Sequence, residues 1–172
     1  MKAKSLISWR LWIYSLIKRV LPETKCFYLK RILLRWAGAT IGQNVRICSS
    51  ADFIGSGELV IQHNTWVGHR VMICSSSSIV IGADVDIAPE VYIGTGTHMP
   101  QFDGVKAAGM GQSLDVSIGD GVWLCVRSTI CPGISVPRGS IVAAGAVVIN
   151  KMTESGLVAG VPAEYKRRFK HG

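Results

Sequence analysis

Residues 81–98 read IGADVDIAPEVYIGTGTH, which divides into three six-residue units that each begin with isoleucine. The same ruler, started at Ile41, gives fifteen hexads, and their first position is always Ile, Leu, Val or Phe. A strand alternates its faces every two residues, so a period of six indicates a short strand followed by a tight corner. Three such sides form a triangular coil, and fifteen hexads therefore predict about five coils stacked around an aliphatic column.

Three interruptions of the period follow a third hexad and therefore share one predicted corner. Two are short, Leu59-Val60 and Ile79-Val80, and the third is the loop 99–117. The last residue before this loop is His98, at the sixth position of its hexad, which faces outward. An exposed imidazole can accept a proton near neutral pH, so the sequence predicts a reactive histidine beside a flap that projects from a corner.

The N-terminal segment 1–36 carries the whole net charge of +8, because residues 37–172 contain equal numbers of acidic and basic residues. Its pattern predicts amphipathic helices within 4–19 and 24–36, separated by Pro22. We expect these helices to cap the open end of the solenoid, to lie on an anionic membrane, or to do both. We expect no nucleic-acid partner, because the aromatic residues form no base-stacking platform.

The five cysteines give no sign of a disulfide framework or a metal centre. Four of them occupy the small second position of a hexad, which is a packing position, so we expect them to be reduced and no metal to bind. No apolar stretch reaches the length of a membrane span, and no cleavage site follows residues 11–17. We therefore expect a cytoplasmic protein, with peripheral contact at the inner face of the membrane.

The hexads, together with VAAGAVV at 142–148 and LVAGVPAEYKRR at 157–168, resemble the hexapeptide-repeat acyltransferases. The chain is most similar to the branch of maltose, galactoside and colanic-acid O-acetyltransferases. The resemblance implies an all-β solenoid, a left-handed parallel β-helix over residues 37–165. The N-terminal helical segment 1–36 would precede it, and a basic tail, 166–172, would follow.

The resemblance also implies an activity: acetyl-CoA-dependent O-acetylation of a sugar in surface-polysaccharide or lipid-linked glycan biosynthesis, with His98 as general base. The family forms homotrimers with active sites between subunits, and outward aromatic residues such as Trp66, Tyr92 and Trp123 would be covered there. The side chains of Asp103, Asp115 and Glu90, or a backbone carbonyl, would orient His98.

The binding residues follow from the same resemblance. The positions that would hold acetyl-CoA are Val126, Ala144, Ile149, Lys166 and Arg167. Glu164 departs from the family pattern, in which a basic residue is common. Candidate acceptor-binding residues are His69, Arg70, Asp103 and Trp123. Arg70 replaces an asparagine of the galactoside enzymes, which suits an anionic acceptor or a different sugar.

Three alternatives remain open on the sequence. In the first, the enzyme would transfer an acetyl group to a nitrogen atom, or would transfer a longer acyl group. Its acceptor would be an amino-sugar or another small molecule. A zinc hydratase on the same fold needs three convergent histidines, and His63, His69 and His98 lack the required spacing. A non-catalytic β-helix scaffold would tolerate the loss of His98.

Overall fold

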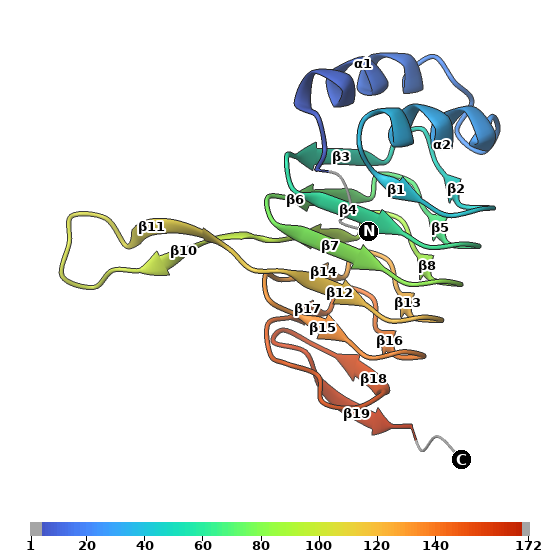
Figure 1. The fold of residues 1–172 in the computed structure, drawn as a ribbon. Coiled ribbons are helices and arrows are strands. Elements are labelled where there is room, and N and C mark those ends of the chain that lie inside the picture. Colours follow the sequence, from blue (N-terminus) through green and yellow to red (C-terminus); the bar gives the residue numbers. More distant parts are fainter. Residues whose placement is uncertain (1–4, 170–172) are drawn as a thin grey trace.

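The computed structural model describes residues 5–169 as a three-sided parallel β-solenoid with two helices over one end and a long two-stranded arm (Figure 1). Each side of the prism is one sheet. Sheet A contains β1 (Thr40–Ile41), β4 (Glu58–Ile61), β7 (Ser78–Ile81), β12 (Val116–Ile118) and β15 (Ser135–Val136). Sheet B contains β2 (Arg46–Ile47), β5 (Trp66–Val67), β8 (Asp86–Ile87), β13 (Trp123–Leu124), β16 (Ile141–Val142), β18 (Gly156–Ala159) and β19 (Glu164–Arg168). Sheet C contains β3 (Asp52–Gly55), β6 (Met72–Ser75), β9 (Tyr92–Gly94), β14 (Thr129–Ile130) and β17 (Val147–Val148).

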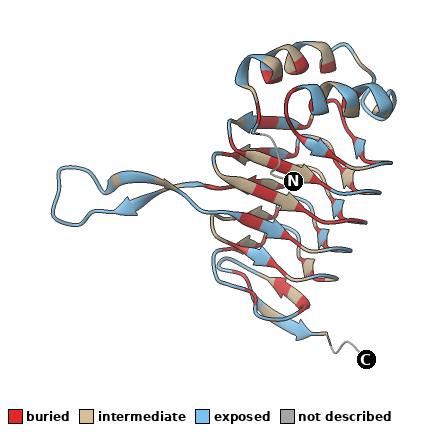
Figure 2. Ribbon diagram, in the orientation of Figure 1, coloured by how far each residue is buried: buried red, intermediate tan, exposed pale blue. Residues whose placement is uncertain are grey.

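The predicted aliphatic column is confirmed, because the first residue of every hexad is buried (Figure 2). These residues are Ile41, Ile47, Phe53, Ile61, Val67, Ile73, Ile81, Ile87, Ile93, Ile118, Leu124, Ile130, Val136, Val142 and Val148. In-register parallel pairing stacks each one on its counterpart in the next coil, as Val67, Ile87 and Leu124 stack along sheet B. Burial of this continuous column is the main favourable term of the fold.

The number of coils differs slightly from the prediction. Five complete coils run from β1 to β17, and β18 then adds part of a sixth to sheet B. The chain turns back after β18, so that β19 pairs with it antiparallel. Lys166 and Arg167 therefore lie within a strand, and the boundary predicted at 165/166 falls inside β19.

All three interruptions of the period lie at the corner between sheets C and A, as predicted. The extra residues lengthen β3, β4, β6 and β7 to four residues each. They also add a second inward row, in which Leu59, Ile79 and Val116 are buried and paired. The insertions therefore widen the core at this corner, and the arm leaves from the widened edge.

The corner between sheets A and B explains part of the hexad pattern. Asn44, Asn64 and Asp84 each adopt a positive φ, between 54° and 60°, a conformation that Asn and Asp tolerate better than most residues. Their side chains form a ladder along the prism: Asn44 donates to Asn64 at 3.1 Å, and Asn64 donates to Asp84 at 2.8 Å. The ladder links three successive coils at their turns.

Helices α1 (Ser8–Lys18) and α2 (Phe27–Trp36) cover the end of the solenoid formed by its first coil. Leu11, Tyr14 and Leu34 are buried and belong to the same core as the aliphatic column. Both predicted helices are thus confirmed, and they form a cap. Among the described residues, no helix is long and apolar enough to cross a membrane.

Basic side chains of the cap donate hydrogen bonds to backbone carbonyls at the open edge of the first coil. This coil has no preceding coil to pair with. Lys30 donates to the carbonyl of Ile47 at 3.0 Å, and Arg31 to that of Val45 at 3.0 Å. Arg35 donates to the carbonyls of Ile41 and Gly42, and Lys18 to that of Ala51 and to Asp52. Unpaired edge groups would otherwise be costly where they are buried. Part of the N-terminal basic excess is therefore structural.

Candidate active site

The arm that carries His98 is an antiparallel hairpin of β10 (Gly96–Pro100) and β11 (Ala108–Ser113). It leaves the corner between sheets C and A and projects away from the prism (Figure 1). The predicted flap is therefore an extended arm that does not fold over its own solenoid. A shift of register between His98 and Pro100 marks a bulge, a feature that redirects neighbouring side chains.

The imidazole of His98 is oriented by a backbone carbonyl. Its Nδ1 lies 2.9 Å from the carbonyl oxygen of Gly109 on the opposite strand. A carbonyl only accepts hydrogen bonds, so Nδ1 carries a proton, and in the neutral tautomer with this proton the lone pair is on Nε2. The side chain is exposed, and this tautomer leaves Nε2 able to accept a proton from a bound hydroxyl.

The three carboxylates considered for this role have other surroundings. Asp115 accepts a hydrogen bond from the Ser78 backbone at 3.0 Å, and Asp103 is exposed near the tip of the arm. Glu90 pairs with Arg70 and Arg127. Of the groups that the sequence left open as partners of His98, the backbone carbonyl is the one that contacts the imidazole in the structure. Nothing in the sequence around Gly109 signals it, because it depends on the register of the hairpin.

The candidate acceptor residues do not meet within one chain. His69 and Arg70 lie at the corner between sheets B and C, whereas His98 and Asp103 lie on the arm, which leaves a different corner. Trp123 is on the outer face of sheet B and is half exposed. A single chain therefore supplies only separate parts of the predicted acceptor site.

Charged side chains at the corner between sheets B and C form a ladder that sequence reasoning missed. Arg70, Glu90 and Arg127 occupy equivalent turn positions in three coils and all have a positive φ, between 53° and 62°. Hydrogen bonds from Arg127 and Arg70 hold the pKa of the Glu90 carboxyl below its usual range. Arg70, expected to contact an anionic acceptor, is thus already paired within the chain.

The candidate acetyl-CoA residues are exposed but dispersed. Val126 and Ala144 lie in consecutive coils at the corner between sheets B and C, where Gly145 donates its backbone N–H to the Val126 carbonyl at 2.9 Å. Ile149 follows β17 at the other edge of sheet C and is 54% exposed. The three positions border one face of the prism, that of sheet C.

The basic residues of β19 differ in their availability. Lys166 lies 3.8 Å from the carboxylate of Glu164, the residue that departs from the family pattern. Arg168 pairs with Glu154 and stacks over Tyr165. Arg167 is exposed, so it is the member of this group best suited to contact a phosphate.

The aromatic residues expected to lie under a partner subunit differ in how far other residues of the same chain cover them. Trp66 packs edge-on against Phe27 of α2, with ring centroids 6.1 Å apart, so the cap covers it. Tyr92 is half-buried on sheet C, and Trp123 is 50% exposed.

One group of metal-type ligands lies at the junction of cap and solenoid. The ligand atoms of Glu23, Cys48 and His69 are within 4.8 Å of one another. Burial and the Glu23 carboxylate raise the pKa of Cys48 to about 11, and the buried ammonium of Lys30 interacts with the same thiol. The Glu23 carboxylate also accepts hydrogen bonds from the backbone N–H and the hydroxyl of Ser50, so two members of this cluster already have partners within the chain.

The histidines of the described chain, 5–169, lie at three different places on the prism. His63 is at the corner between sheets A and B, His69 at that between B and C, and His98 on the arm. They do not converge within one chain, as a hydratase would require of its zinc ligands.

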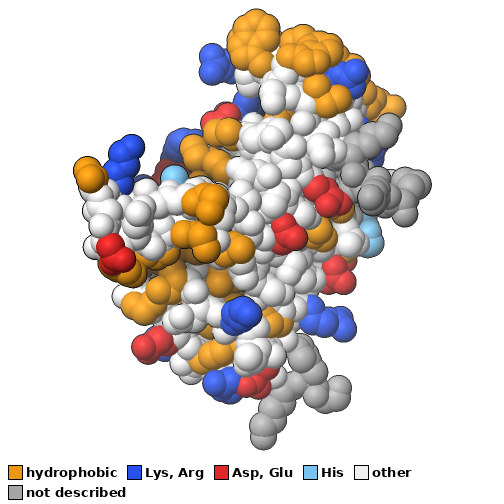
Figure 3. Space-filling model, turned by 60° about the vertical axis from the view of Figure 1, so that its left-hand side comes forward, with side chains coloured by type: hydrophobic (Ala, Val, Ile, Leu, Met, Phe, Trp, Pro, Cys, Tyr) orange, Lys and Arg blue, Asp and Glu red, His pale blue; other side chains and the backbone are white. Residues whose placement is uncertain are grey.

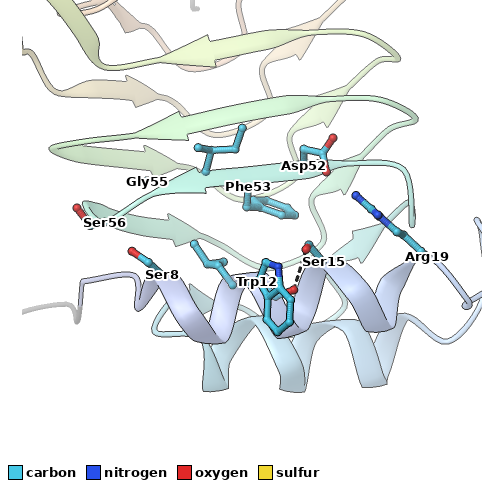
Figure 4. A pocket seen from close by; sticks show the side chains of 10 residues that line it. Ser8, Trp12, Ser15, Arg19, Asp52, Phe53, Gly55 and Ser56 are labelled. Atoms are coloured by element: carbon cyan, nitrogen blue, oxygen red, sulfur yellow. Dashed lines mark hydrogen bonds between the residues drawn. The ribbon is translucent and has the colours of Figure 1, made fainter.

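A groove of about 580 Å³ lies between α1 and β3 and does not contain His98. Figure 4 shows that Trp12 of α1, Arg19 just after this helix, and Asp52 and Phe53 of β3 line it. Ser15 donates to the Trp12 carbonyl at 2.7 Å there. None of the residues that line this groove belongs to the arm.

Known proteins resemble the chain in sequence, although no family model matches it. "Putative acetyltransferase YJL218W" of Saccharomyces cerevisiae is 34% identical over 111 residues, which are 64% of this chain and 56% of the relative. Galactoside O-acetyltransferase of Escherichia coli is 27% identical over 143 residues, 81% of this chain and 70% of the relative. Proteins of Escherichia coli named for colanic acid and lipopolysaccharide biosynthesis also match.

A solved structure shares the fold over nearly the whole chain. The hexapeptide-repeat acetyltransferase VCA0836 of Vibrio cholerae O1 biovar eltor, complexed with acetyl coenzyme A, superposes with a TM-score of 0.77. The match covers 95% of this chain and 87% of that one at 21% identity. The solenoid is thus a left-handed parallel β-helix, and its handedness is the one that the family resemblance implied.

Sequence and fold together identify the chain as a hexapeptide-repeat protein homologous to galactoside, colanic acid and lipopolysaccharide O-acetyltransferases. These homologues belong to the family that the chain was expected to resemble. The chain spans about half the length of the two yeast relatives it matches, 56% of the Saccharomyces cerevisiae protein and 44% of one from Schizosaccharomyces pombe.

Proposed function

We propose that this protein is an acetyl-CoA-dependent O-acetyltransferase that acts on a sugar hydroxyl, with His98 as its general base. The observation that carries the proposal is the contact between His98 Nδ1 and the Gly109 carbonyl, at 2.9 Å. It fixes the tautomer that a general base needs. The names of the relatives, which include galactoside O-acetyltransferase, support the choice of a sugar hydroxyl as acceptor.

The chemistry would proceed by direct transfer between two bound substrates. Nε2 of His98 removes the proton of the acceptor hydroxyl as its oxygen attacks the thioester carbonyl of acetyl-CoA. The tetrahedral intermediate then expels the thiolate of CoA, which takes the proton back from the imidazolium. A backbone N–H would stabilise the oxyanion. General-base catalysis contributes about 10²–10⁴-fold to such a reaction, and the alignment of the two substrates supplies much of the remainder.

We propose further that the active site lies between the subunits of a homotrimer. The arm and its base expose a series of apolar side chains, each 42% exposed or more: Met99, Phe102, Val105, Met110 and Leu114. Such a surface on a projecting hairpin is unfavourable in water unless another molecule covers it. A neighbouring prism would cover it and bring a second solenoid face towards His98, which would join the separated acceptor and acetyl-CoA residues.

Replacement of Phe102 by Asp tests the trimer. Phe102 is 91% exposed, so the substitution should leave the fold of one chain intact. We expect the variant to lose the trimeric mass in light scattering and to lose activity with it. A wild type that is monomeric at the concentration of an active assay would contradict the intersubunit site.

The acceptor would be a surface polysaccharide or lipid-linked glycan precursor, used in the cytoplasm. A lipid-linked acceptor would require the enzyme to work at a membrane surface, in agreement with the cationic N-terminal segment.

The activity is tested by incubating the protein with acetyl-CoA and a panel of sugars, nucleotide-sugars and lipid-linked glycans. Release of the CoA thiol reports turnover, and mass spectrometry identifies the acetylated acceptor. Mild alkali distinguishes an ester, which it cleaves, from an amide, which it does not. We expect an alkali-labile product. An alkali-stable product would show N-transfer, and no product with any acceptor would argue against the proposal.

A further inference from the structure

The outer face of the helical cap carries exposed apolar side chains at helical spacing. On α1, Trp9, Trp12 and Leu16 follow one another at i, i+3 and i+7 and are 57%, 63% and 43% exposed. On α2, the residues with this spacing are Leu29, Ile32 and Trp36, which are 38–40% exposed. The opposite side of each helix packs on the solenoid, so each helix has one buried and one exposed apolar stripe.

Cationic side chains accompany these stripes. The guanidinium of Arg10 lies between the rings of Trp9 and Trp36, 5.2 and 5.1 Å from their centroids. Arg31 lies 5.7 Å from the ring of Tyr28, which is 69% exposed. Arg19 and Lys25 are exposed in and beside the connection between the helices. Figure 3 shows hydrophobic and basic side chains together at the helical end of the molecule.

This positive charge is not neutralised within the cap. The only acidic residue of segment 1–36 is Glu23, and its carboxylate is occupied by Ser50 and lies 3.4 Å from His69. The carbonyl oxygens that accept from Arg31 and Arg35 carry no net charge. The face therefore combines tryptophan and tyrosine rings with a net positive field.

We propose that this outer face of the cap binds the surface of an anionic phospholipid membrane. Amphipathic tryptophan and tyrosine rings prefer the headgroup region, and arginine and lysine beside them attract an anionic leaflet. The helices are too short to cross a bilayer, so the cap lies in the interface.

Two other occupants fit the observations less well. A second copy of the chain, related by a twofold axis, would bring two cationic faces together, which is repulsive. A nucleic acid would match the charge but would leave Leu16, Leu29 and Ile32 without an apolar partner. Only a lipid interface satisfies the aromatic, aliphatic and basic side chains together.

Docking through the cap would leave the arm free. The helices cover one end of the prism, whereas the arm projects from its side. In a trimer with parallel prism axes, which rests on the proposed function, three caps would face the same way and bind with greater avidity. Binding of a single cap does not depend on the acetyltransferase proposal.

The test is co-sedimentation of the full chain with vesicles of phosphatidylcholine alone or with three-tenths phosphatidylglycerol. We expect binding to the anionic vesicles that weakens with salt. Trp9→Ser combined with Trp12→Ser should weaken it about tenfold or more, because two exposed rings lose their apolar contact. Arg19→Glu combined with Lys25→Glu should weaken it about 25-fold or more, at roughly fivefold for each charge.

Matched controls lie at the opposite end of the prism. Val161→Ser changes a residue that is 72% exposed, and Lys151→Glu reverses an exposed charge. Both should bind vesicles like the wild type, and circular dichroism should be unchanged in every variant. Acetyl transfer to a soluble acceptor, measured in parallel, separates failure of docking from failure of the proposed function.

Four outcomes would overturn the proposal. These are no binding to anionic vesicles, equal binding to neutral vesicles, and binding that the cap substitutions do not weaken. The fourth is a cap substitution that breaks up a larger assembly of the chain, or that abolishes binding to a labelled oligonucleotide which the wild type binds more tightly than vesicles. The cap face would then bind a protein in the first case and a nucleic acid in the second.

Discussion

Replacement of Lys30 by Met tests how the cap is held on the solenoid. The side chain is fully buried, and its ammonium donates to the carbonyls of Pro22, Glu23 and Ile47 at 3.0, 2.8 and 3.0 Å. Methionine fills a similar volume but leaves these carbonyls without that donor. Burial lowers the pKa of Lys30, which shows that keeping the ammonium here has a cost of its own.

The expected loss of unfolding free energy depends on which of the three carbonyls keep another hydrogen-bond donor. Those of Pro22 and Glu23 also accept from Ser49, at 3.0 and 3.2 Å. The Ile47 carbonyl lies on β2, the end strand of sheet B, where Lys30 replaces the missing coil. An unsatisfied buried carbonyl costs about 1–3 kcal/mol, and two weakened bonds add about 1 kcal/mol each. The recovered desolvation of the ammonium offsets part of this sum, so we expect a net loss of about 2–4 kcal/mol.

The assay is urea denaturation together with hydrogen exchange of the α1, α2 and first-coil amides, because a solenoid can lose its end unit before the remainder. Lys25→Met is the matched control, since Lys25 is exposed and its replacement should change stability by less than about 0.5 kcal/mol. If Lys30→Met were as stable as the wild type, or more stable, with unchanged protection of the cap, the edge-capping role of Lys30 would be wrong.

Three further predictions concern the core, the thiols and the response to acid. Ile87→Ala, at a fully buried site, should cost about 2–5 kcal/mol in urea denaturation, whereas Ile54→Ala, at a site that is 51% exposed, should cost much less; equal losses would contradict the column. Iodoacetamide at mildly alkaline pH should modify the exposed Cys26 and spare Cys48, which is buried and has a pKa raised to about 11, as peptide mass spectrometry would show. The lowered pKa of Glu90 means that its carboxylate contributes stability above about pH 4.3 and that this contribution is lost as the pH falls through the lowered pKa. Glu90→Gln should therefore lose less stability on acidification than the wild type, and an identical acid profile would refute a role for the arginine ladder.

The solenoid could be predicted from sequence because its signal is local and repeated. Each hexad carries its own inward Ile, Leu, Val or Phe, and most carry a small second residue, so the fifteen buried positions could be read directly. The three insertions were assigned to one corner by counting alone. The partial sixth coil was missed because the next hexad would begin at Glu154, which breaks the aliphatic period before Leu157 and Val158.

The site was less predictable because its contacts depend on pairing between distant residues. His98 could be singled out by its position before the interruption. Its partner, the Gly109 carbonyl, is set by the register of β10 on β11, which no residue type reports. The ladder through Arg70, Glu90 and Arg127 was missed because arginine and glutamate at positive φ are uncommon.

The cap shows how a charge pattern can have more than one cause. At helical spacing Lys18 shares the polar side of segment 4–19 with Ser8 and Ser15, but it is buried and donates to Ala51 and Asp52. The sequence indicated a basic amphipathic segment correctly. It could not distinguish the bases that complete the first coil from those, such as Arg19, that face solvent, because this depends on how the helices sit on the prism.

The most direct test of the account is the rate of acceptor-dependent CoA release by His98→Ala, compared with the wild type and with His63→Ala. Both histidines are exposed, so neither substitution should affect the fold. We predict a loss of about 10²–10⁴-fold for His98→Ala and an unchanged rate for His63→Ala. A His98→Ala enzyme that consumes acetyl-CoA as fast as the wild type, with the same acceptor, would contradict the assignment of the base.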